Sequence, residues 1–470
     1  MARHRFPEGF LWGTATSAQQ IEGGRHDGGR GESIWDRFAA IPGKIADGSR
    51  PDVTCDHYHR WREDIGLMSG LGMGAYRFSI AWPRIIPAGR GKADPAGLDF
   101  YDGLVDGLLE AGIQPFPTLY HWDLPQVLQD EGGWANRNLT GAFADYAAAV
   151  VRRLGDRVKR WTTHNEPWCI ATLGHEEGHH APGHTDPAEG LRVAHHLLLS
   201  HGLAAGVIRD EVPGAEVGIV LIHCPAEPAT PRESDREAAR WFDGFFNRWY
   251  LDPLFRSRYP EDAVWDRVQR GHLPGSDLPF LRDGDLETIA APLDFLGLNY
   301  YSRNVMRMGP AGLPEAVPAP PSAERTAMGW EVHPRGMEDA LLRVHRDYGP
   351  GCIYVTENGA AFPDPAPVDG RIADPRRIAY LRGHLLAVHR AVAAGVPVRG
   401  YFAWSLLDNF EWGYGFEKTF GLFALEPDTL DRIPKDSAFW YRDAAAVNAV
   451  DDDDDHPLPS TRGESRALDA

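Results

Sequence analysis

The sequence predicts a single-domain (β/α)8 (TIM) barrel over residues 1–450, and three observations support this prediction. Short apolar runs rich in β-branched and aromatic residues recur along the chain, which is typical of buried parallel strands. Amphipathic stretches of helical periodicity separate these runs. No linker divides the 470 residues. Roughly 150 residues per domain would suggest about three domains, but single α/β barrels often run well past that length.

Eight apolar runs are the strand candidates. In chain order they are FLWGTA (10–15), GAYRFSI (74–80), PFPTLYH (115–121), VKRWTTHN (158–165), VGIVLI (217–222), LDFLGLNY (293–300), CIYVTEN (352–358) and VRGYFAWS (398–405). Eight strands that alternate with helices favour a closed barrel. An open doubly wound sheet is the alternative that the pattern leaves open.

Three helices and two loops complete the pattern. Helical periodicity predicts helices over 98–112, where Gly112 gives a typical C-terminus, and over 143–155 and 377–395. The Pro-rich segment 309–325 is expected to be a long surface loop over a site, because loops of that length are usually functional or disordered. The shorter segment 362–370 is expected to behave in the same way.

Charge and composition exclude several classes of protein. The net charge is −19, of which the acidic segment 451–470 carries −5. This segment is expected to be a disordered tail, and the remaining −14 argues against a nucleic-acid partner. No apolar run approaches the roughly 20 residues of a membrane span. The N-terminus has no apolar signal core, and the four cysteines form no CxxC pair, so a reduced cytoplasmic protein is expected.

Polar and aromatic side chains close the predicted strands, where the active site of such a barrel lies. They are Gln20, Arg77, His121, Trp122, Asn165, Glu166, Asn299, Tyr301, Glu357, Asn358, Trp404, Glu411 and Trp412. Amides and carboxylates suit the hydroxyls of a neutral sugar, and indole faces suit the C–H side of its ring. No phosphate-binding GxxxxGK(S/T) or GxGxxG motif follows a strand.

Two glutamates at separate strand ends indicate the paired-carboxylate chemistry of glycoside hydrolysis. One carboxyl must donate a proton to the leaving oxygen, while the other must be ionised to attack the anomeric carbon. Arg77 and Tyr301 are expected to hold Glu357 ionised. Glu166 precedes Pro167 and Trp168, an apolar setting that favours the protonated form.

Several long segments resemble glycoside hydrolase family 1, which contains β-glucosidases and β-galactosidases. They occur in the family's order over residues 6–443, and they are FPEGFLWGTATSAQQIEGG (6–24), THNEPW (163–168), LNYYSRN (298–304), GWEVHPRG (329–336), YVTENG (354–359) and WSLLDNFEWGYGFEKTFGL (404–422). The resemblance implies a retaining β-glycosidase on a (β/α)8 barrel that uses no cofactor or metal. Its expected partners are small β-glycosides or short β-linked oligosaccharides.

The resemblance also assigns roles to residues. It implies that Glu166 is the acid/base and Glu357 the nucleophile. Residues expected to contact the sugar or the aglycone are Gln20, His121, Trp122, Asn165, Asn299, Tyr301, Trp330, Trp404, Glu411, Trp412 and Phe420. Among these, Glu411 is expected to bind the hydroxyls at O4 and O6, and Trp330 to stack on the aglycone. The resemblance does not distinguish glucose from galactose or fucose, and the oligomeric state stays open.

Three other functions are alternatives to this one. A 6-phospho-β-glycosidase tends to have Ser at the position of Glu411 and Tyr at that of Phe420. A non-catalytic sugar-binding barrel would lack one of the two glutamates. The segment 175–179 spells the zinc-binding HExxH motif, but two glycines interrupt it and a Pro follows, so a loop above the site is expected.

Overall fold

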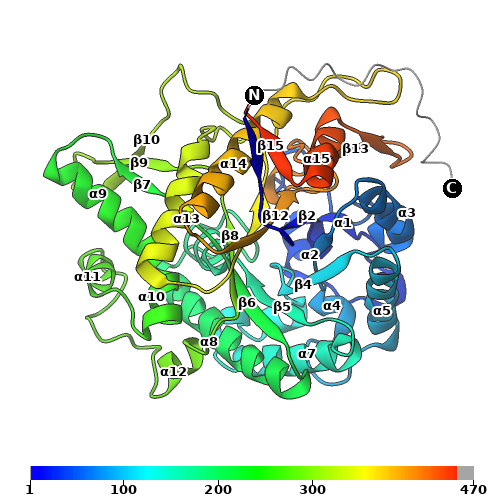
Figure 1. Cartoon of the computed structure of the whole chain (residues 1–470). Coiled ribbons are helices and arrows are strands. Elements are labelled where there is room, and N and C mark those ends of the chain that lie inside the picture. Colours follow the sequence, from blue (N-terminus) through cyan, green and yellow to red (C-terminus); the bar gives the residue numbers. More distant parts are fainter. Residues whose placement is uncertain (1, 453–470) are drawn as a thin grey trace.

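The computed structural model describes residues 2–452, and a closed barrel of eight parallel strands forms its centre (Figure 1). The strands, in barrel order, are β2 (Leu11–Ala15), β3 (Ala75–Ser79), β4 (Gln114–Tyr120), β5 (Arg160–Asn165), β6 (Glu216–Ile222), β8 (Phe295–Asn299), β11 (Ile353–Asn358) and β12 (Val398–Trp404). Pairing between β12 and β2 closes the ring. All eight predicted strands are therefore confirmed, and the open sheet is excluded.

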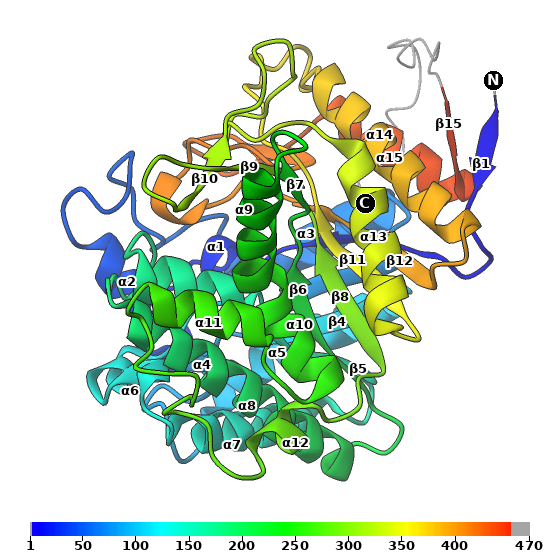
Figure 2. The ribbon, with the colours of Figure 1, turned by 90° about the vertical axis from the view of Figure 1, so that its left-hand side faces the viewer.

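Helices surround the barrel and fill its connections (Figures 1 and 2). The longer ones are α3 (His57–Gly70), α5 (Pro95–Glu110), α7 (Leu139–Leu154), α8 (Pro187–Glu211), α9 (Glu233–Asp243), α13 (Pro334–Tyr348), α14 (Pro375–Ala393) and α15 (Asp436–Val447). The shorter ones are α1 (Ala18–Ile21), α2 (Ile34–Ala39), α4 (Trp82–Ile85), α6 (Gln126–Asp130), α10 (Trp249–Arg256), α11 (Glu261–Gln269) and α12 (Asp285–Ile289). The three predicted helices correspond to α5, α7 and α14.

Local sequence explains where the long helices begin. At the start of α8, the Asp186 side chain accepts hydrogen bonds from the backbone N–H groups of Ala188 and Glu189, and Pro187 occupies the first turn. Asp94 and Pro95 open α5 in the same way. An acidic N-cap satisfies backbone donors that the helix leaves free, and a proline loses nothing there.

Three small sheets lie outside the barrel. Strands β1 (Arg3–Arg5) and β15 (Ala449–Asp451) pair antiparallel. The predicted acidic tail, residues 451–470, therefore begins at the last residue of β15. Its residues from 453 onward lie outside the described part of the chain. Strands β13 (Phe423–Leu425) and β14 (Arg432–Pro434) form a hairpin. Strands β7 (Ala226–Pro228), β9 (Asn304–Met308) and β10 (Pro314–Val317) form a sheet on which α9 packs (Figure 2).

The predicted loop 309–325 is wrong in part, because it contains β10. Pro314–Val317 pairs antiparallel with β9. Proline cannot donate to a strand ladder and is found on edge strands, and β10 is the edge strand of its sheet. The proline content that suggested a loop is therefore compatible with a strand at this edge.

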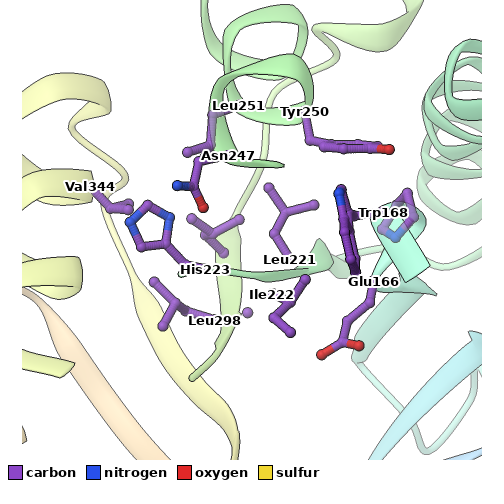
Figure 3. A pocket seen from close by; sticks show the side chains of 13 residues that line it. Glu166, Trp168, Leu221, Ile222, His223, Asn247, Tyr250, Leu251, Leu298 and Val344 are labelled. Carbon is purple, nitrogen blue, oxygen red and sulfur yellow. The ribbon is translucent and has the colours of Figure 1, made fainter. Parts of the chain in front are cut away.

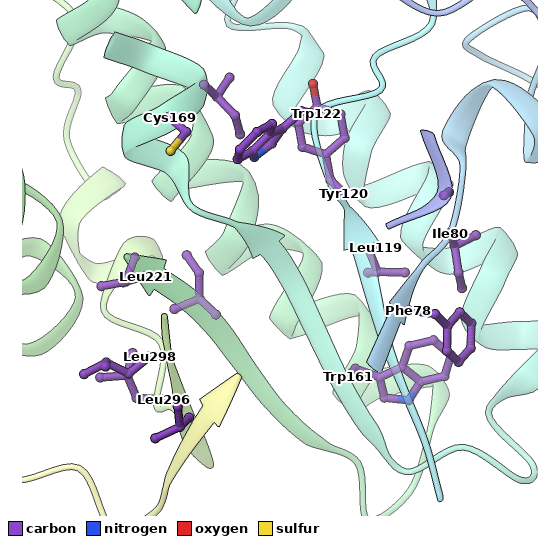
Figure 4. Close-up of a cluster of buried hydrophobic side chains, with 14 of the residues drawn as sticks. Phe78, Ile80, Leu119, Tyr120, Trp122, Trp161, Cys169, Leu221, Leu296 and Leu298 are labelled. Atoms are coloured by element: carbon purple, nitrogen blue, oxygen red, sulfur yellow. The ribbon is translucent and has the colours of Figure 1, made fainter. Parts of the chain in front are cut away.

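Two apolar layers position the site. Between strands and helices, large side chains such as Phe78, Leu119 and Trp161 form a continuous buried cluster (Figure 4). Inside the barrel, the fully buried ring of Phe116 lies 5.2–5.3 Å from the rings of Phe295, Tyr354 and Phe402. A Cβ at Gly218 would come within 2.4 Å of the Phe295 ring, so a glycine is needed there. This aromatic plug fills the barrel below the strand ends.

Helix α8 is long and apolar enough to cross a membrane by length and composition alone. In the folded chain 78% of its apolar window is buried. The helix packs against α7, so its apolar surface serves the core of the protein.

Candidate active site

Most of the strand-end residues meet in one pocket of about 500 Å³. Those predicted from the sequence that line it are His121, Trp122, Glu166, Tyr301, Trp330, Glu357, Trp404, Glu411, Trp412 and Phe420. Gln20, Arg77, Asn165 and Asn299 are buried and make hydrogen bonds to residues of this wall. The exception among the predicted strand-end residues is Asn358, which does not line the pocket and whose amide instead hydrogen bonds to Tyr300, Tyr380 and Tyr401.

Glu357, the last residue but one of β11, is held by two donors. A guanidinium nitrogen of Arg77, from β3, donates to its Oε1, and the Tyr301 hydroxyl donates to its Oε2 at 2.7 Å. Arg77 is fully buried, and the Glu357 side chain is 4% exposed. Both carboxyl oxygens of Glu357 therefore accept from the protein, and one of them accepts from a buried cation. This environment suits a carboxylate that attacks an electrophilic carbon.

Glu166 lines the same pocket, but its hydrogen-bond donors among residues 2–452 are the neutral side chains of Asn299 and Cys169. Leu221, Leu298 and Trp168 surround a small cavity beside it (Figure 3). Burial first, and then the charge of Glu357, raises the pKa of Glu166 to about 8. A carboxyl with this pKa carries its proton at neutral pH and can protonate a leaving oxygen.

Three aromatic or acidic residues of the site have left-handed backbone conformations. The φ angles are +78° at Trp122, +47° at Glu166 and +50° at Trp412. Such a conformation costs a non-glycine residue about 1–3 kcal/mol and is concentrated at active sites. Here it turns each side chain toward the pocket that the three residues line.

Asn165 hydrogen bonds to Arg77 and His121, and these contacts determine which ring nitrogen of His121 carries the proton. Arg77 has only donors, so its contact of 2.6 Å identifies the Asn165 Oδ1 atom, and the amide Nδ2 must face His121 Nε2 at 3.1 Å. Burial, followed by the charge of Arg77, lowers the pKa of His121 well below its usual value. The neutral ring therefore accepts at Nε2 and carries its proton on Nδ1. That buried Nδ1 has no hydrogen-bond partner in residues 2–452.

The sugar side of the pocket combines flat rings with polar groups. The His121 ring is stacked on those of Trp404 and Trp412, at 5.9 Å in both cases. Gln20 Nε2 donates to Asn409 at 2.9 Å and approaches Glu411 Oε2 at 3.4 Å. Burial, and then the charges of Glu357 and Glu166, raises the pKa of Glu411 to about 8.

The mouth of the pocket is aromatic on one wall. Tyr301 and Trp330 lie 5.3 Å apart between ring centres, and Phe420 lies within 6.4 Å of both. The remaining lining residues were not predicted from the sequence, and they include Lys44, Trp168, Cys169, Leu173, His179, His180, Met328 and Tyr414. These residues belong to segments that connect strands and helices, and local sequence patterns do not predict how those segments run around the pocket.

The HExxH segment does not form the two-histidine face of a zinc protease. Its first two residues, His175 and Glu176, lie in the π-helical segment η3 (Cys169–Glu176), whereas residues 177–179 form a loop, as the sequence predicts. Gly174, which suggested a break, lies inside this segment, where a Cβ would come within 2.7 Å of the Ala181 carbonyl oxygen. The segment ends before His179, whose side chain is 74% exposed, whereas His175 is buried.

One group of side chains near this segment could hold a metal ion. Its members are His175, His184 and Glu189, whose ligand atoms lie within 4.8 Å of one another. Glu189 Oε1 already accepts from both imidazole Nδ1 atoms, at 2.6 and 2.5 Å. These hydrogen bonds account for the arrangement, and none of the three residues lines the catalytic pocket.

Comparisons with known proteins agree with this geometry. The family model described as Glycosyl hydrolase family 1 matches residues 2–450. Beta-glucosidase A of Acetivibrio thermocellus is 47% identical over 451 residues, which cover 95% of this chain and all of that protein. A bifunctional beta-D-glucosidase/beta-D-fucosidase of Bifidobacterium breve is 44% identical, covering 93% of this chain and 97% of the relative. The solved family 1 β-glucosidase of Thermotoga maritima has a TM-score of 0.92 and 45% identity, covering 96% of this chain and 100% of its own.

Proposed function

The chain belongs to glycosyl hydrolase family 1, and we propose that it is an exo-acting β-glucosidase that hydrolyses with retention of anomeric configuration. The observation that carries the proposal is the pair formed by Glu166 and Glu357. The two carboxyls line one pocket, where Arg77 and Tyr301 favour the ionised Glu357 while an apolar setting keeps Glu166 protonated.

The reaction then takes two steps. Glu357 attacks the anomeric carbon while Glu166 donates its proton to the glycosidic oxygen, so the aglycone leaves as an alcohol and a glycosyl ester forms on Glu357. In the second step Glu166, now a carboxylate, removes a proton from water. The water oxygen attacks the same carbon and releases Glu357. Acid/base assistance of this kind contributes about 10²–10⁴ in rate.

The sugar pocket supports a neutral, terminal β-D-glucose. Glu411, Gln20 and His121 offer polar groups for its hydroxyls, and Trp404 and Trp412 offer flat faces. Because a relative 44% identical is a glucosidase and a fucosidase, β-fucosides are included among the proposed substrates, with β-galactosides as a weaker class. Short β-linked gluco-oligosaccharides, such as those released from cellulose, and a cytoplasmic location are part of the same proposal.

A 6-phosphorylated sugar fits this pocket poorly. The position that would receive the phosphate is occupied by Glu411, and the nearest charges that act on it are those of Glu357 and Glu166. A phosphate dianion there would meet the like charge of the Glu357 carboxylate, which is costly when desolvated. The relatives at 42–48% identity are named as glucosidases, which favours the neutral sugar.

A kinetic panel and two variants test the proposal. We expect kcat/KM to rank nitrophenyl β-glucoside and β-fucoside above β-galactoside, with the 6-phosphates inactive. Glu357→Ala should abolish turnover, and Glu166→Ala should spare the first step for aryl glycosides with good leaving groups, because these need little protonation. Proton NMR should detect the β-anomer first. Initial release of the α-anomer, or an active Glu357→Ala enzyme, would refute the mechanism.

A further inference from the structure

Both oxygens of the Glu166 carboxyl are held by donors from the protein. Asn299 Nδ2 donates to Oε1 at 2.7 Å, and the Cys169 thiol donates to Oε2 at 3.1 Å. Each of the three side chains is at most 5% exposed. A carboxyl has about four acceptor positions, so these two contacts leave room for the acidic proton. They do restrict the plane in which the carboxyl can lie.

The orientation of Asn299 itself has a cause in the neighbouring strand. Thr356, from β11, donates its hydroxyl proton to Asn299 Oδ1 at 2.7 Å. The amide nitrogen is therefore directed to Glu166 and, at 3.2 Å, to Asn165 Oδ1. If the amide lost this anchor, its N–H would donate less effectively to the carboxyl. Thr356 is fully buried and immediately precedes Glu357 in the chain, yet it acts on the other carboxyl.

We propose that Cys169 and Thr356 are positioning residues for the acid/base: the thiol holds Glu166 Oε2 directly, and the hydroxyl holds Oε1 through Asn299. This inference rests on the proposed function, since it assumes that Glu166 serves first as an acid and then as a base. Neither residue was predicted from the sequence, and each is proposed to act through Glu166 and not on the substrate.

The hydrogen bonds from Asn299 and Cys169 to Glu166 affect both steps of the proposed reaction. Burial and the charge of Glu357 both raise the pKa of Glu166, whereas the hydrogen bonds from Asn299 and Cys169 lower it. Without these donors the carboxyl would hold its proton more tightly, and release of that proton to a poor leaving group would be slower. The donors also stabilise the carboxylate that must act as the base in the second step.

The test compares isosteric losses of each donor. Cys169→Val removes the thiol donor, and Thr356→Val removes the hydroxyl, while Cys169→Ser and Thr356→Ser restore one. Because the thiol hydrogen bond favours the carboxylate form of Glu166, Cys169→Val should move the basic limb of the kcat/KM profile up by about one to two pH units. Thr356→Val should move it in the same direction, and both serine variants should return it toward the wild-type position.

A second readout separates positioning from a loss of folding. At neutral pH both valine variants should lose about tenfold in kcat/KM with poor leaving groups and much less with dinitrophenyl glucoside, which needs little acid assistance. Thr118→Val is the matched control. It changes a buried threonine of β4 whose hydroxyl has no hydrogen-bond partner in residues 2–452, so it should leave both readouts unchanged.

Each outcome decides the proposal. A basic limb that stays within 0.2 pH units of wild type in Cys169→Val refutes the role of the thiol, and the same result in Thr356→Val refutes that of the hydroxyl. Equal losses on all substrates without a shift of the limb would show a structural role only. Failure of the proposed function would give a different result, because Glu357→Ala with Cys169 and Thr356 unchanged would then remain active.

Discussion

Replacement of Arg77 by Met removes the positive charge that contacts Glu357 and tests the electrostatic argument most directly. The methionine keeps much of the apolar stem, but it leaves the 4% exposed carboxylate without a counter-charge, in a pocket that also contains Glu166 and Glu411. The least costly response is for Glu357 to bind a proton, and a protonated carboxyl does not attack carbon. The Arg77→Met substitution also removes the 2.6 Å contact between Arg77 and Asn165 Oδ1.

The magnitude follows from what a broken buried pair costs. Removing one partner of such a pair costs about 3–5 kcal/mol, which corresponds to roughly 10²–10⁴ in rate at 1.36 kcal/mol per tenfold. We expect a loss of this size in kcat/KM for nitrophenyl β-glucoside. The inactivation rate by a 2-deoxy-2-fluoro-glucoside should fall in parallel, because it reports the attack by Glu357 alone.

Arg84→Met provides a matched control. Arg84 and Glu22 form a pair at 3.0 Å whose side chains are 0% and 5% exposed, against 0% and 4% for Arg77 and Glu357. Both variants should lower the free energy of unfolding by about 3–5 kcal/mol, but Arg84→Met should keep the rate per folded molecule. The reasoning is refuted if Arg77→Met retains kcat/KM within about threefold, or if both variants lose the same rate.

Three further results are expected. Because the pKa of Glu166 is raised to about 8 and the first step needs its proton, kcat/KM should fall as pH rises through about 8. This fall should be absent in Glu166→Ala. A wild-type kcat/KM that stays constant up to pH 10 would contradict the assignment of Glu166 as the acid. Glu411→Gln should lower kcat/KM by about 10–10², because sugar hydroxyls that donate to Glu411 favour its carboxylate and the amide replaces these hydrogen bonds only in part; unchanged kinetics would exclude that contact. Leu198→Ala, in the fully buried face of α8, should lower the free energy of unfolding by about 2–5 kcal/mol in urea titrations at unchanged kcat per folded molecule.

The barrel was predictable because each strand is a local signal. A buried parallel strand is an apolar run, and eight such runs that alternate with helices leave few topologies. The positions of Glu166 and Glu357 followed from the same pattern, since each directly follows or ends a run. Their convergence on one pocket is a consequence of the closed barrel, which brings all C-terminal strand ends to one face.

The features that were not predicted depend on contacts between distant segments. Thr356 contacts Asn299 across two neighbouring strands, and the sequence separation of 57 residues gives no hint of it. Cys169 lies only three residues after Glu166, a helical spacing, but the glycines of the HExxH segment argued against a helix there. Gly174 proved to permit close packing against Ala181, a requirement that only the tertiary structure reveals.

The aromatic plug built around Phe116 has a consequence for the order of events. Since these rings fill the barrel beneath the reacting groups, the sugar does not leave through the barrel. The sugar occupies the inner part, so it can depart only after the group nearer the opening has gone. Free glucose that diffuses back into the emptied inner part therefore competes with the next substrate for the same pocket.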